Sequence, residues 1–167
     1  MVDVLGLAAH LAPNTVRQLE VAAERRYEEG ECLKRQNRLL AALYLYGYSV
    51  EMCLAAAYFR SAGFSLSQTI DDDTRRRRMA QARQLRLMSN EPHPLDGCAR
   101  VLEWHRHSSG SIAPQEQDRL REAVRKAERV YRHWRPELWY KLTCVPTNQL
   151  DEVRRCVRWF IEQRGHL

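Results

Sequence analysis

The segment that most constrains this chain is a long apolar stretch at residues 38–62, RLLAALYLYGYSVEMCLAAAYFRSA. Its apolar side chains would lie on nearly every side of a helix, which predicts a central helix surrounded by others. Gly47 in its middle weakens a helix by up to about 1 kcal/mol relative to Ala, so it predicts the close approach of a neighbouring helix. Gly63 is suited to end the helix. The chain is therefore expected to form a multi-helix bundle.

The rest of the chain also follows a helical pattern. Apolar residues recur at spacings of three and four, and no stretch alternates cleanly at period two. Asn14 is predicted to cap the first helix, and Gly30 is a candidate break in it. Helices are predicted at residues 14–36, 38–62, 74–88 and 95–107, from 114 to about 136, and after 146. This order predicts an all-α fold, an up-and-down helical bundle of five to six helices. The 167 residues are expected to form one domain, 14–167, after an N-terminal extension, 1–13.

The composition is basic and contains few cysteines. The net charge is +6, and Lys and Arg side chains can neutralise phosphates, so RNA is an allowed partner. Arginine outnumbers lysine 24 to 3, which a GC-rich coding bias also explains.

No apolar run approaches the roughly 20 residues of a membrane span, and no secretory signal is evident, so we expect a cytoplasmic protein with no membrane partner. Free, largely buried thiols are expected because no CxxC pair occurs among Cys32, Cys53, Cys98, Cys144 and Cys156.

The candidate nucleic-acid-binding residues follow an acidic triplet, Asp71 to Asp73. Arg75, Arg76, Arg83 and Arg86 fall within about 100° of one another on the predicted helix 74–88, and so form its most basic face. A solvated surface without a ligand is the alternative interpretation of this face.

Glu51 stands out among the carboxylates because it lies inside the apolar segment 38–62. An ionised carboxylate there needs a partner, most simply an arginine from another helix. Such a buried pair would be either structural or functional. His93, Cys98, His105 and His107 form one possible metal cluster, but His105 and His107 would point about 200° apart on a helix and could not easily reach one ion. We therefore expect no metal and no cofactor.

Three short segments resemble sequences of the HEPN family, the "higher eukaryotes and prokaryotes nucleotide-binding" domains. Residues 44–54, YLYGYSVEMCL, resemble the helix of type A-x-Y-L-x-G-Y-x-x-E-x-x-L-K at the centre of that bundle. Residues 93–95, HPL, resemble a His-Asp-Leu that opens a later helix, and 134–140, WRPELWY, resemble a late W-x-x-E-x-R-Y motif. The resemblance covers roughly residues 14–162. It departs from the family at Ala55, Pro94 and Trp139, which replace Lys, Asp and Arg.

The resemblance implies partners and an activity. HEPN bundles commonly pair, so a homodimer is expected, and a nucleotidyltransferase-type antitoxin is a candidate partner protein. Many members are metal-independent ribonucleases with an R-x4-6-H motif. Arg100 and His105 match this motif, as does Arg100 with His107, although Arg100 and His105 would lie about 140° apart on one helix. Arg135 and Tyr140 are the second candidate pair.

The sequence and the resemblance leave three candidate functions. The first is a non-catalytic module that associates with nucleotides, RNA or a protein. The second is a ribonuclease of toxin or defence type that uses Arg100 and His105, the arginine holding the phosphate and the histidine moving a proton. The third is a purely structural interaction bundle. The missing charges at positions 55, 94 and 139 and the poor helical spacing of Arg100 and His105 favour the first or the third function over the ribonuclease.

Overall fold

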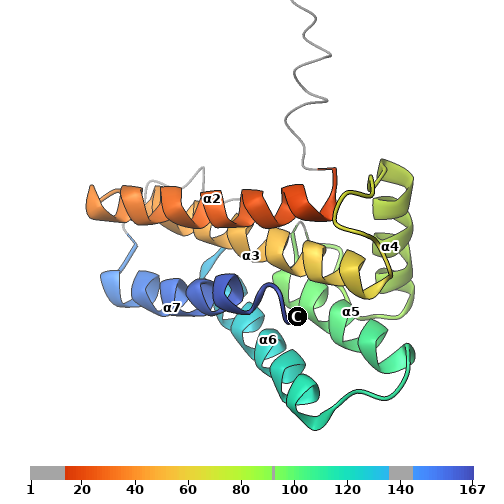
Figure 1. The fold of residues 1–167 in the computed structure, drawn as a ribbon. Coiled ribbons are helices and arrows are strands. Elements are labelled where there is room, and N and C mark those ends of the chain that lie inside the picture. The colour runs from red at the N-terminus through yellow and green to blue at the C-terminus, as the bar shows by residue number, and fades with distance from the viewer. Residues whose placement is uncertain (1–13, 92, 136–144) are drawn as a thin grey trace, which may run out of the picture.

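A computed structural model describes residues 14–91, 93–135 and 145–167 (Figure 1). These residues contain no strand, which confirms the all-α helical bundle. The expected extension 1–13 lies outside the described residues. The helices are α2 (Val16–Arg35), α3 (Leu39–Ser61), α4 (Asp72–Gln84), α5 (Leu95–Ser108), α6 (Pro114–His133) and α7 (Thr147–Gln163).

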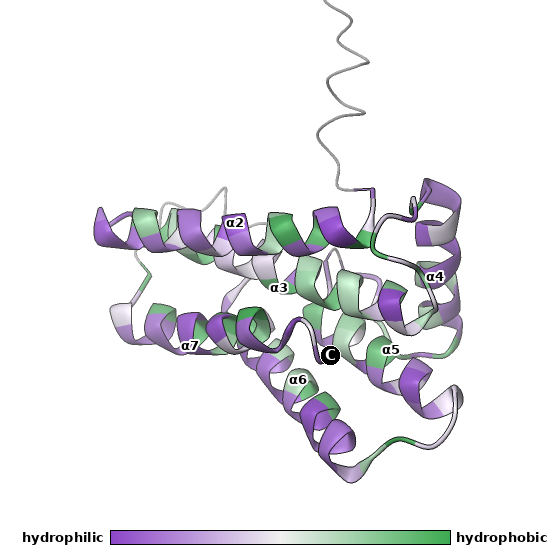
Figure 2. Cartoon of the chain, in the orientation of Figure 1, coloured by the Kyte–Doolittle hydropathy of each residue, from purple (hydrophilic) through white to green (hydrophobic). Residues whose placement is uncertain are grey.

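Helix α3 lies at the centre of the bundle, as its composition predicts. α2 packs along it, and α5 and α7 contact it from other sides (Figure 1). Its buried side chains run from Ala42 to Phe59 and are distributed around the helix axis. Figure 2 shows the contrast with the outer helices, which carry many more hydrophilic residues than α3 does. The apolar segment thus forms the core that the other helices cover.

Gly47 is confirmed as a point of close approach, but the neighbour is a side chain. A Cβ at Gly47 would lie 2.1 Å from the indole ring of Trp134, which is fully buried at the end of α6. The Trp134 Nε1 donates a hydrogen bond to the backbone oxygen of Tyr44 at 3.1 Å. Gly63 follows the end of α3 with a φ of +86°, a conformation that glycine adopts without steric cost.

By length and composition α3 would also suit a membrane span, in contrast to the sequence argument. Half of its most apolar window is buried inside the bundle.

Several helix ends differ from the predictions. Thr15, rather than Asn14, caps α2, because its hydroxyl accepts a hydrogen bond from the Gln18 amide. Gly30 does not break α2; it lies buried inside the helix against the ring of Tyr46. Pro146 occupies the cap position of α7, so this helix begins directly after 146 as predicted.

Helix α4 stands across the ends of α2 and α3, so it departs from a simple up-and-down order (Figure 1). It begins at Asp72 because the Asp71 carboxylate accepts a hydrogen bond from the Thr74 amide at 2.7 Å. It ends at Gln84, so Arg86, which the predicted helix 74–88 includes, lies outside α4, with a φ of +57°. The only buried residues of α4 are Arg78 and Ala82, so only a narrow stripe of this helix is packed against the bundle.

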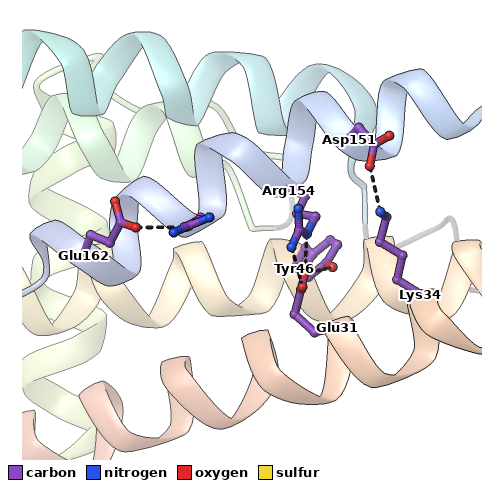
Figure 3. Close-up of polar contacts among 7 residues, drawn as sticks. Glu31, Lys34, Tyr46, Asp151, Arg154 and Glu162 are labelled. Atoms are coloured by element: carbon purple, nitrogen blue, oxygen red, sulfur yellow. Dashed lines mark hydrogen bonds and ion pairs between the residues drawn. The ribbon is translucent and has the colours of Figure 1, made fainter.

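The opposite end of the bundle is joined by a compact polar cluster (Figure 3). Arg154 of α7 donates from Nε and Nη2 to the two carboxylate oxygens of Glu31 on α2, at 2.6 Å each. The hydroxyl of Tyr46 on α3 donates to the same carboxylate. The Arg154 hydrogen bonds are the main cause that lowers the pKa of Glu31. The Glu31 carboxylate therefore joins three helices by accepting hydrogen bonds from Arg154 and Tyr46.

Candidate functional site

A hollow of about 330 Å³ lies between α3, α4 and the start of α5. Its wall is largely apolar and includes Leu19, Ala55, Phe59 and Met79. Four polar side chains, Glu51, Arg75, Arg78 and His93, also line it. A concave apolar surface with a few converging polar groups has the general form of a small-molecule site.

Arg78 is the most buried of these charged groups, with 8% of the residue exposed. Its guanidinium lies 4.4 Å from the ring centroid of Tyr58 and 5.6 Å from that of Phe59. Among the described residues, its Nε and Nη2 atoms have no hydrogen-bond partner. Because a guanidinium keeps its charge at any pH a protein survives, the aromatic rings stabilise the cation but leave donors unused.

Glu51 pairs with a histidine, not with the expected arginine. His93 Nδ1 lies 2.7 Å and 2.9 Å from the two carboxylate oxygens. A φ of +52° at His93 turns the chain between α4 and α5 so that the imidazole meets α3. The Glu51 side chain is 27% exposed and that of His93 38%, so the pair is part-buried and not buried as expected. The imidazole packs edge-on against Tyr48.

The two residues of the R-x4-H motif have different partners. Arg100 donates to Glu128 on α6 at 2.7 Å and lies 3.5 Å from Asp96. The hydrogen bond to Glu128 is the main cause that raises the pKa of Arg100. His105 Nδ1 lies 3.1 Å from the hydroxyl of Ser61 at the end of α3, and burial lowers the pKa of the imidazole. Within one copy of the chain, α5 therefore directs the pair to different neighbours.

The second candidate pair is described only in part. Arg135 lies over the ring of Tyr131, with its guanidinium carbon 3.4 Å from the ring centroid, and donates to the Trp134 carbonyl at 3.2 Å. Tyr140 lies outside the described residues.

The four arginines of the predicted basic face do not share one surface. Arg75 is half-buried and lines the 330 Å³ hollow. Arg76 is exposed, 3.7 Å from Asp73. Arg83 and Arg86 are exposed and line a second hollow, of about 410 Å³. This second hollow also includes Arg100 and Asp96. The structure thus separates Arg75 from Arg83 and Arg86, which line different hollows, while Arg76 lines neither of the two.

Sequence reasoning missed Arg78 and the pairing of His93. A signal for Arg78 was present, because Arg75, Arg78 and Ala82 are spaced by three and four residues and so share one helical stripe. That stripe is the side of α4 that faces the bundle. No local sequence pattern predicts the positive φ of His93, since glycine is the residue that normally occupies such a position.

The cysteines and metal ligands add no further centre among the described residues. Cys53, Cys98 and Cys156 are buried and free, while Cys32 is exposed and Cys144 lies outside the described residues. Burial raises the pKa of Cys98, in the wall of the 330 Å³ hollow, to about 11, so the thiol is protonated at neutral pH. In the ranges 14–91, 93–135 and 145–167, no three His, Cys, Asp or Glu side chains group closely enough to hold a metal. No family model, curated protein or solved structure matches this chain.

Proposed function

We propose that this chain is a HEPN-like, non-catalytic module that associates with RNA through phosphate contacts on the exposed arginines around α4. The observation that carries the proposal is the group of exposed cations Arg76, Arg83 and Arg86, two of which line an open hollow. Flexible arginine side chains at such a surface contact phosphates and release counterions. The separate engagement of Arg100 and His105 supports binding over cleavage.

The test is the salt dependence of binding to a single-stranded RNA. A variant with Arg76, Arg83 and Arg86 all changed to Ala should bind more weakly. If all three contact phosphates, the slope of log K against log salt should fall by about 2. The matched control changes three exposed arginines of α6, Arg121, Arg125 and Arg132, to Ala, which removes the same charge elsewhere. Equal losses in the two variants would refute the assignment to α4.

A cleavage assay in EDTA tests the non-catalytic part of the proposal. We expect the purified protein to leave RNA intact. Cleavage that disappears in folded Arg100→Ala and His105→Ala variants would instead identify a metal-independent ribonuclease and overturn this part. The homodimer, the nucleotidyltransferase-type partner and the cytoplasmic location stay predictions that rest on the resemblance and the sequence. Sedimentation of the purified chain measures the first of them.

A further inference from the structure

The 330 Å³ hollow between α3, α4 and α5 contains a cation that the fold itself leaves with unused donors. Arg78 reaches into the bundle from α4, a helix with few buried residues, and only 8% of Arg78 is exposed. Two of its three guanidinium nitrogens, Nε and Nη2, have no hydrogen-bond partner among the described residues, although the side chain also contacts Cys98. Unsatisfied donors on a buried charge are unfavourable, so these two nitrogens can donate to an anion.

Charges near Arg78 also favour an anion. Of the four polar residues of the hollow, two are arginines, Arg75 and Arg78. The single carboxylate, Glu51, is turned to the imidazole of His93, which contacts both of its oxygens. Among the described residues Arg78 forms no ion pair with a carboxylate, in contrast to Arg154 at the other end of the bundle. The hollow therefore has an excess of positive charge.

The wall of the hollow defines the rest of the ligand. Leu19, Ala55, Phe59 and Met79 present apolar surface beside the guanidinium. The short side chain of Ala55 keeps this surface open on the α3 side, one helical turn from Glu51. A ligand that fits this wall has an apolar body, and its charged group must reach Arg78.

We propose that this hollow binds a small organic oxyanion, with a single phosphate or carboxylate group held by Arg78 and an apolar body against Ala55, Phe59 and Met79. The planar guanidinium matches both head groups through paired hydrogen bonds. This site is separate from the exposed arginines proposed to contact RNA, so each can fail without the other.

Calorimetric titration with four probes tests the site: phenyl phosphate, phenylacetate, inorganic phosphate and benzyl alcohol. We expect one of the two aromatic anions to bind more tightly than benzyl alcohol, and the tighter of them identifies the head group. Inorganic phosphate should bind more weakly than phenyl phosphate if the apolar wall contributes. Equal affinity for the uncharged alcohol, or no binding of either aromatic anion, would overturn the proposal.

Three variants locate the binding. Arg78→Met should weaken the binding of the preferred aromatic anion about tenfold or more, because it removes charge-assisted hydrogen bonds while keeping a side chain of similar length. Ala55→Leu should weaken the binding of the aromatic anion without a change in net charge, because the larger side chain fills part of the hollow. The matched control is Arg121→Met, since Arg121 is exposed on α6, 3.7 Å from Asp118, and is not among the residues that line the hollow.

Unchanged affinity in Arg78→Met, or an equal loss in Arg121→Met, would refute the site. Should Arg78→Met fail to fold, Arg78→Lys replaces it, because Lys retains the charge but cannot form the paired hydrogen bonds of a guanidinium. Arg78→Lys should then lose affinity for the aromatic anion, and affinity equal to that of the unmodified protein would overturn the proposal. RNA binding by the same variants should be unaffected, which separates this test from that of the proposed function.

Discussion

Two arginines reach from outer helices into opposite ends of the bundle (Figure 1 and Figure 3), and their surroundings differ. Arg154 of α7 meets Glu31 through two hydrogen bonds, and that carboxylate also accepts from Tyr46 (Figure 3). Arg78 of α4 lies against the rings of Tyr58 and Phe59 and lines a hollow. The donors of Arg154 are therefore used to hold helices together, whereas two donors of Arg78 remain available to a ligand. The same residue type supports stability in one place and a ligand site in the other.

The largest effect should follow from removing the shared carboxylate. Glu31→Ala leaves the Arg154 guanidinium and the Tyr46 hydroxyl without their partner, so the free energy of unfolding should fall by about 3 kcal/mol. This value is at the low end for buried pairs because Arg154 is 33% exposed. Chemical denaturation measures it. Glu28→Ala, an exposed position on the same helix, should change the free energy of unfolding by less than about 0.5 kcal/mol; equal losses would mean that the cluster contributes nothing specific.

A smaller loss should come from Gly30→Ala. The new Cβ would lie 2.6 Å from the ring of Tyr46, so the ring must shift and its hydroxyl must leave Glu31. The gain in helix propensity, about 1 kcal/mol, offsets part of this overpacking, and the net loss should be about 2 kcal/mol. Gly165→Ala is the control, because no atom lies within 4 Å of a Cβ built there. A stabilised Gly30→Ala would show that this end is packed more loosely than described.

Sequence reasoning found the packing of the fold more readily than the polar pairings. The apolar composition of residues 38–62 predicts the central helix, and Gly47 predicts the close approach that Trp134 makes. Both depend on local pattern. The partner of Glu51 depends on the φ of His93, and the burial of Arg78 depends on how α4 crosses the bundle. Arginine is usually exposed, so its identity alone gave no reason to place Arg78 inside.

The pH dependence of stability should distinguish Glu31 from other carboxylates. Arg154 lowers the pKa of Glu31 in the folded protein, so near the ordinary value of 4.5 the unfolded chain binds more protons than the folded one. The stabilisation is present in full above that value and is lost as the pH falls through the lowered pKa. The free energy of unfolding should therefore decrease more steeply from about pH 5 to pH 3 in the unmodified protein than in Glu31→Gln. Parallel curves would refute this coupling.

The smallest effect is expected at Arg78, and it is the one that separates the two ends most directly. Replacing Arg78 with Met removes a charge that has unused donors and leaves an apolar side chain among Tyr58, Phe59 and Met79. Loss of the contact with the aromatic rings and relief of the buried charge act in opposite directions. The free energy of unfolding should therefore stay within about 1 kcal/mol of the unmodified value.

The matched change at the other end, Arg154→Met, leaves Glu31 without its cation and should lower the free energy of unfolding by about 2 kcal/mol. Denaturation of both variants under one set of conditions makes the comparison. If Arg78→Met destabilises the protein as much as Arg154→Met does, Arg78 is a structural cation in the same sense as Arg154. If it does not, the position retains a charge that folding does not require, because a side chain of similar size without the charge packs there equally well.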